Sequence, residues 1–468
     1  MVFSSLSFLF LFLPLTFLLY ALVRGNKARK LILAAASLVF YAFGEPVAVG
    51  IMLISIGLNY VFGRGAAGSR WDRLAVILAV LLNIGLLAAY KYTGFFVEIL
   101  NDVLRLSLPV PQIRLPIGIS FFTFQGLSYV IDVYRDKKNV QKKFFSVLLY
   151  ISFFPQLIAG PIVRYSDIAA QLDRREFSFD RISRGICRFL FGLAKKVLIA
   201  NQMGLIADRV FSCSSGQLGT TAAWLGAVCY TLQIFFDFCG YSDMAIGLGC
   251  MFGFDFRENF NYPFISGSIR EFWRRWHISL STWFKEYVYI PLGGNRKGKT
   301  RTTINKWIVF FLTGLWHGAS FTFILWGLWH GLWQMLETWQ IVPTKKKWFR
   351  TIGHVYTMLV VIIGFVMFRA DTLSQGFDVL SAMFRPQERS FTQNAELLSL
   401  LSPVFWIAFS FALLLSTPVF RVLREKAKST GRLTAYNCAA CAGSLVLFAL
   451  SVLSLASDSY NPFIYFRF

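Results

Sequence analysis

Long apolar segments alternate with short polar loops along almost the whole chain. The charge-free segments are Val2–Val23, Pro46–Gly63, Leu74–Tyr90, Leu115–Ile131, Phe144–Val163, Val210–Phe236, Trp307–Leu336, Thr351–Phe368, Leu397–Phe420 and Leu433–Ser457. A helix needs about 20 apolar residues to cross a bilayer, and several segments reach that length while the others approach it. The pattern predicts an all-α, polytopic membrane protein with about 10–11 transmembrane helices.

Two stretches within the body of the chain, Arg164–Lys196 and Asp255–Lys306, carry many charges. Both are interpreted as too polar to cross, and their aromatic residues favour an interfacial or cavity-lining position. In the second stretch, Glu271–Tyr287 has its Trp side chains on one helical face and its Arg and Lys side chains on the other, which predicts one amphipathic helix. His277 falls on the apolar face. It either lies at the water boundary or points inward toward a cavity.

The segment Trp307–Leu336 is the most informative one. As a single helix it would be about 45 Å long, which exceeds a hydrocarbon core of about 30 Å. It must therefore tilt, break or re-enter, and Gly318-Ala319-Ser320 is the natural break. Two identical motifs, Gly-Leu-Trp-His-Gly, contain His317 and His330.

A histidine inside a membrane is costly unless it faces a cavity or a partner, and its pKa suits proton transfer. His317 is a candidate general base, with a packing role as the alternative. For His330 packing is favoured.

The composition agrees with this class. Of 468 residues, 56% are hydrophobic and only 15% are charged, and the net charge is +23. The basic residues concentrate in short loops, which the positive-inside rule explains without a ligand. No basic stripe with interleaved aromatics lies outside the apolar segments, so nucleic acid is not expected as a partner. None of the four histidines forms an i, i+4 pair with another, so no metal site is expected either.

The same charge bias predicts the topology. Placing the basic loops Arg24–Lys30, Lys345–Arg350 and Arg421–Lys428 in the cytoplasm puts Met1 outside and the aromatic tail, 458–468, on the extracytoplasmic side. No linker divides the chain, so residues 1–468 are interpreted as a single integral-membrane domain in the cell membrane.

Two polar features have open roles. Asp237 and Asp243 interrupt a membrane segment and are interpreted as anchoring helices through Arg partners or lining a hydrophilic cavity. The glycine-rich loop that contains Arg296, Lys297 and Lys299 suits an anionic cofactor, with ordinary positive-inside topology as the alternative.

Several short sequence motifs, taken in their order along the chain, resemble those of the membrane-bound O-acyltransferases. The resemblance is strongest to the bacterial branch that acylates polysaccharides and contains the alginate O-acetyltransferase membrane subunit. The words are Glu271-Phe-Trp-Arg-Arg-Trp-His277, Gly-Leu-Trp-His317-Gly, Leu115-Pro-Ile-Gly-Ile-Ser120, Leu157-Ile-Ala-Gly-Pro161, Phe236-Asp-Phe-Cys-Gly-Tyr-Ser-Asp-Met244 and Leu292-Gly-Gly-Asn-Arg296. The resemblance covers essentially the whole chain. It implies a ring of helices around a central tunnel within the lipid bilayer.

The resemblance also implies an activity and a site. His317 matches the family's histidine, and His277 matches its second polar position. The implied reaction moves acetyl from cytoplasmic acetyl-CoA, with no bound cofactor, to an extracellular polysaccharide with the help of an extracytoplasmic esterase-like partner. The ending with Phe463, Tyr465 and Phe468 is similar to tails in which a tyrosine relays the acyl group, and an interfacial anchor is the alternative. D-alanyl transfer from a carrier protein and a transporter stay open as other functions.

Overall fold

The computed structural model describes residues 1–468 except 69, 159, 214–217, 345, 386–394, 458–459 and 465–468. The described part of the chain contains helices and no strand. It divides into two compact units. One comprises Met1–Phe189 with Ser242–Arg257, and the other comprises Leu190–Tyr241 with Glu258–Phe468. The predicted all-α fold is confirmed.

Six helical segments are long and apolar enough to cross a membrane, and a seventh is obtained when α20 (Pro403–Leu415) and α21 (Val419–Ser429), which meet at 59°, count as one span. The six are Ala48–Ala67, Asp72–Leu104, Phe179–Phe211, Thr220–Met251, Thr351–Arg369 and Leu433–Ser457. This confirms a multi-pass membrane protein. The sequence-based number of 10–11 also includes segments that fold as shorter or broken helices. The ring around a tunnel stays a prediction.

One polar stretch does not behave as expected. The second half of Arg164–Lys196 forms α10 (Phe179–Ala194), which opens the candidate span Phe179–Phe211, so the interpretation as too polar to cross was wrong there. The charges on this span have partners. Arg188 lies 2.8 Å from Asp243, and Lys196 lies 2.9 Å from Asp237. Pairing makes ionised side chains tolerable at membrane depth.

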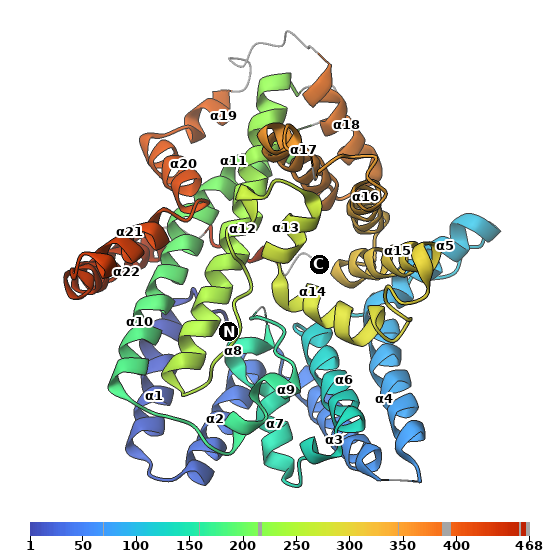
Figure 1. The fold of residues 1–468 in the computed structure, drawn as a ribbon, viewed down its shortest axis with the longest axis vertical. Helices are drawn as coiled ribbons and strands as arrows, with labels where there is room; N and C mark the ends of the chain where they lie inside the picture. The colour runs from blue at the N-terminus through green and yellow to red at the C-terminus, as the bar shows by residue number, and fades with distance from the viewer. Residues whose placement is uncertain are drawn as a thin grey trace. The chain divides into compact units, whose positions relative to one another are not determined.

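The first unit is built mainly from helices of the first third of the chain. They are α1 (Leu13–Leu22), α2 (Asn26–Ala42), α3 (Ala48–Ala67), α4 (Asp72–Leu87), α5 (Thr93–Leu104), α6 (Ile119–Arg135), α7 (Phe144–Ser152), α8 (Phe154–Leu157) and α9 (Tyr165–Ile168). Helices α3, α4 and α6 pack together (Figure 1). The buried amides of Asn59 and Asn83 hydrogen bond across α3 and α4 at 2.9 Å, as polar side chains do between membrane helices.

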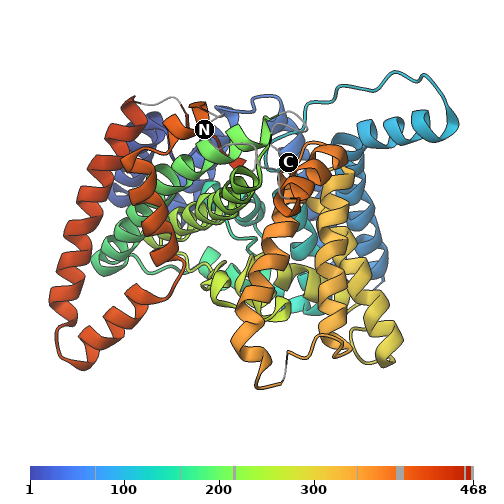
Figure 2. The ribbon, with the colours of Figure 1, turned by 90° about the horizontal axis from the view of Figure 1, so that it is seen from above.

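The second unit contains the later helices. They are α11 (Asn201–Phe211), most of α12 (Thr220–Met251), α13 (Ile269–Arg275), α14 (Ile278–Phe284), α15 (Gly298–His317), α16 (Phe321–Thr338), α17 (Phe349–Arg369), α18 (Leu373–Phe384), α19 (Ala395–Leu400), α20, α21 and α22 (Leu433–Ser457). Helix α21 packs against both α20 and α22, and Figure 2 shows these three helices at one edge of the ribbon.

Helices α15 and α16 form the tightest helix pair of this unit. The predicted break is confirmed, because α15 ends at His317 and Ser320 caps α16 by accepting a hydrogen bond from the Thr322 amide at 3.3 Å. Helix packing explains why the Gly-Leu-Trp-His-Gly motif occurs in both helices. A Cβ atom on Gly327 would lie 3.0 Å from the Gly314 backbone nitrogen, so both words place a glycine where the helices touch.

The predicted amphipathic helix over Glu271–Tyr287 is broken. Helix α13 ends at Arg275, α14 begins at Ile278, and a π-helical turn follows at Lys285–Tyr289. His277 lies between them with φ 43°, in the left-handed region. The single-helix expectation was therefore wrong. A non-glycine residue in this conformation is costly, and such positions gather at functional sites.

Candidate active site

His277 and His317 line the same small cavity in the second unit. Their ring centroids are 6.3 Å apart. The other lining residues are Ile234, Phe238, Trp276, Trp326, Phe365, Phe368 and Ile464. The cavity measures only about 10 Å³, so it holds at most one water molecule. The two histidines that the sequence singled out thus meet at one narrow site.

His317 is held by aromatic side chains at the C-terminal end of α15. Its ring centroid lies 5.0 Å from those of Trp316 and Trp326 and 5.1 Å from that of Phe368. Only 7% of the residue is exposed. An apolar enclosure of this kind keeps water from the imidazole and strengthens any hydrogen bond that it makes with a substrate.

Asn259 fixes the orientation of His277. The Asn259 side-chain oxygen accepts hydrogen bonds from the Ser279 amide at 3.1 Å and from the Ser279 hydroxyl at 2.8 Å, and it lies 3.2 Å from His277 Nδ1. Because a backbone amide can only donate, the Asn259 atom is an oxygen, and Nδ1 must carry the proton. The lone pair of His277 is then on Nε2. Burial lowers the pKa of His277 to about 3, so the ring is neutral.

His330 is placed differently. It is fully buried, its ring centroid lies 5.3 Å from those of Trp273 and Trp326, and a Cβ atom on Gly364 would lie 3.0 Å from its Nε2. Neither ring nitrogen has a hydrogen-bond partner within the described residues. It does not line the cavity of His277 and His317. These contacts support the packing role favoured by the sequence.

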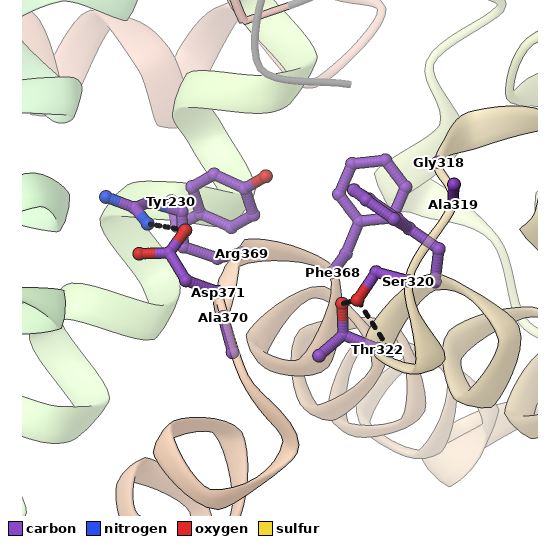
Figure 3. Close-up of a pocket in the computed structure, with 10 residues that line it drawn as sticks. Tyr230, Gly318, Ala319, Ser320, Thr322, Phe368, Arg369, Ala370 and Asp371 are labelled. Carbon is purple, nitrogen blue, oxygen red and sulfur yellow. Dashed lines mark hydrogen bonds and ion pairs between the residues drawn. The ribbon is translucent and has the colours of Figure 1, made fainter. Parts of the chain in front are cut away.

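A larger pocket of about 310 Å³ adjoins the histidine cavity. Figure 3 shows Tyr230, Arg369 and Asp371 on one side and Phe368, Ser320 and Thr322 on the other. Phe368 lines both spaces. On the predicted topology α17 begins in the cytoplasm, so Arg369 at its end and this pocket face the outer side. Phe368 is thus the side chain that this pocket and the histidine cavity have in common.

The basic candidate residues are not gathered at this cavity. Arg296, Lys297 and Lys299 are exposed and lie at the start of α15, about 30 Å from its other end by helical rise. Tyr465 lies outside the described residues, which end at Ile464. Ile464 itself lines the histidine cavity, so the described tail ends at the two histidines.

Sequence reasoning missed Asn259, Phe368 and Ile464. Phe368 and Ile464 are ordinary apolar residues, and no local pattern marks them as cavity-lining. Asn259 had a weak signal, since a buried asparagine in an aromatic segment needs a partner, but its partner depends on the break at His277.

These features agree with the family comparison. The model of the membrane-bound O-acyltransferase family matches residues 110–375, and the chain belongs to this family of multi-pass membrane O-acyltransferases. The chain is 40% identical to a probable alginate O-acetylase of Pseudomonas putida and 41% identical to that of Azotobacter vinelandii, in both cases over the full length of both chains. It is 34% identical to the peptidoglycan O-acetyltransferase of Helicobacter pylori, over 82% of this chain and 80% of the relative. The resemblance read from the sequence is confirmed.

We expect Asn259→Leu to lower the transfer rate about 10- to 100-fold, because the substitution removes the acceptor that fixes the His277 tautomer. The rate and its pH profile are measured at matched membrane levels of protein. Asn259→Asp keeps an oxygen at this position and should retain more activity, with a profile displaced by the added charge. Equal rates for Asn259→Leu and the wild type would show that this contact does not matter for transfer.

Proposed function

We propose that this protein transfers acetyl groups from cytoplasmic acetyl-CoA toward hydroxyl groups of an extracellular polysaccharide, with His317 as general base and Tyr465 as a relay. The observation that carries the proposal is the buried cavity shared by His277, His317 and Ile464. The relatives named as alginate O-acetylase and peptidoglycan O-acetyltransferase support an acetyl group and a glycan acceptor. An extracytoplasmic esterase-like partner completes the transfer.

The chemistry follows from the two imidazoles that line the cavity. His317 takes the proton of an attacking hydroxyl as the new C–O bond forms at the thioester carbonyl carbon. The C–S bond then breaks, and the departing thiolate takes the proton from the imidazolium. General-base help of this kind is typically worth about 10²–10⁴-fold in rate. With its lone pair on Nε2, His277 accepts a hydrogen bond. This favours an orienting role over stabilisation of the oxyanion, which needs a donor.

A cavity of about 10 Å³ cannot hold an acetyl group, so a lining side chain must move. Phe368 is the one that also lines the outer pocket. We expect Phe368→Leu to open this partition and to raise hydrolysis of acetyl-CoA in the absence of acceptor several-fold, because water then reaches the thioester.

Released CoA is measured without acceptor in proteoliposomes. Phe365→Leu is the matched control, because Phe365 lines the histidine cavity but not the outer pocket. If both variants hydrolyse the donor at the wild-type rate, Phe368 is not the partition.

The exposed basic loop at the start of α15 is proposed to attract the donor's phosphates. Reversing two charges, Lys297→Glu with Lys299→Glu, should raise the apparent KM for acetyl-CoA about tenfold at low salt with little change in kcat. The control is Arg424→Glu with Lys428→Glu in α21, which is also exposed and basic. An unchanged KM in the loop variant would leave the loop with a topological role alone.

The substrate assignment is tested with isotopically labelled acetyl-CoA and purified protein in proteoliposomes. Label transferred to the protein, and then to an added polysaccharide when the esterase-like partner is present, is the expected result. Transfer of D-alanine from a carrier protein, with no transfer from acetyl-CoA, would overturn the proposal. It would favour the activity named for the teichoic acid D-alanyltransferase of Bacillus subtilis, which is 31% identical over 44% of this chain.

A further inference from the structure

The C-terminal segment Tyr460–Ile464 is bound by polar side chains of two helices that lie far away in the sequence. Lys196 donates to the Pro462 carbonyl, and Asp237 accepts from the Ile464 amide at 2.8 Å. Asn201 donates to the Tyr460 carbonyl at 3.2 Å, and the Tyr460 hydroxyl donates to Asp208 at 2.6 Å.

The centre of this arrangement is a buried ion pair. The Lys196 ammonium lies 2.9 Å from the Asp237 carboxylate, with side-chain exposures of 1% and 2%. Lys196 also donates to Asn201 at 2.7 Å. Lys196 thus donates to Asn201 and to the Pro462 carbonyl while it forms the ion pair with Asp237.

Burying two charges is expensive, and a pair of apolar side chains of similar volume often gives equal or greater stability. Fold stability alone is therefore a poor explanation for this pair. Each of its members instead uses a hydrogen bond to hold one backbone group of the tail. Apolar contacts complete the fit, since Phe463 stacks on Tyr241 at 4.2 Å and only 6% of Phe463 is exposed.

We infer that Lys196, Asn201, Asp208 and Asp237 form a seat that fixes the C-terminal tail with Ile464 at the histidine cavity. They are positioning residues, because they hold the tail and do not line the cavity. This inference rests on the proposed role of the tail in transfer. The seat is tied to the outer pocket as well, because Asp208 also pairs with Arg369 at 2.7 Å, and Arg369 lines that pocket.

The seat is tested by digesting the purified full-length protein with a carboxypeptidase and measuring by mass spectrometry how fast cleavage passes Ile464. In the double variant Lys196→Met with Asp237→Leu no unpaired charge is buried, yet the Pro462 carbonyl and the Ile464 amide lose their partners. We expect cleavage past Ile464 to become about tenfold faster or more. The matched control is Arg188→Met with Asp243→Leu, which removes another ion pair of this region, and its tail should stay protected.

A second variant guards against a failure to fold. A Cβ atom on Gly204 would lie 2.6 Å from Gln233 Nε2 and 2.7 Å from the Tyr460 hydroxyl oxygen, so Gly204→Ala crowds both the tail and the Gln233 side chain of α12 while improving the helix propensity of α11. It should also expose the tail to digestion. Wild-type protection in both this variant and the double variant would overturn the seat.

Acetyl transfer is measured on the same samples. Faster digestion with loss of transfer supports the seat as a positioning device. Faster digestion with normal transfer would overturn the positioning role, whereas the tyrosine relay is judged separately by Tyr465→Phe. Digestion requires no catalysis, so the seat can be judged even if acetyl-CoA proves to be the wrong donor.

Discussion

His317→Gln is expected to abolish polysaccharide acetylation, with a loss of about 10²–10⁴-fold in the transfer rate. Glutamine keeps much of the volume and a polar end, so the aromatic enclosure formed by Trp316, Trp326 and Phe368 should persist. What is lost is a group that can take a proton near neutral pH. The measurement is label transferred from acetyl-CoA at matched membrane levels of folded protein.

The other two histidines provide the controls for this experiment. His277→Gln should lower transfer strongly but less than His317→Gln. The reason is that His277 lines the cavity and is proposed to orient the substrate there. His330→Gln should have the smallest effect, because His330 packs among Phe272, Trp273 and Trp326 and does not itself line the cavity. Activity near the wild-type level in His317→Gln would remove the general-base assignment.

Tyr465→Phe is expected to give the second large effect. The substitution keeps an aromatic side chain for membrane anchoring and removes only the hydroxyl that would carry the acetyl group. A phenol with a pKa near 10 is only about 0.1% ionised at pH 7, so the relay depends on a base such as His317. We expect polysaccharide acetylation to fall to background while donor binding is retained.

Mass spectrometry of the C-terminal peptide provides a direct readout. With acetyl-CoA present and the esterase-like partner absent, the wild type should accumulate an acetyl group on this peptide, and both Tyr465→Phe and His317→Gln should not. Tyr436→Phe is the control, since its hydroxyl donates to the Phe420 carbonyl on an exposed helix pair. Normal polysaccharide acetylation by Tyr465→Phe would leave the tail as an anchor.

Features set by local sequence were predicted well. The apolar segments indicated an all-α membrane protein because hydrocarbon demands long stretches without charge. The break after His317 followed from Gly318-Ala319-Ser320, where glycine and a helix-capping serine lie in consecutive order. The histidines could be singled out because a titratable ring is rare in an apolar segment, and the order of the short motifs gave the family.

Only the tertiary structure decided how these residues come together. The amphipathic pattern around His277 favoured one helix, yet the backbone turns at His277 so that Asn259 can hold its ring, and this contact gives no local signal. Likewise, nothing in the sequence connects Lys196 and Asp237 with Ile464. Hydropathy records whether a segment is apolar. Helices that are far apart in the sequence must pack together before their charges can pair and hold backbone groups of the tail. The reason is that a buried charge is tolerated only beside an oppositely charged partner.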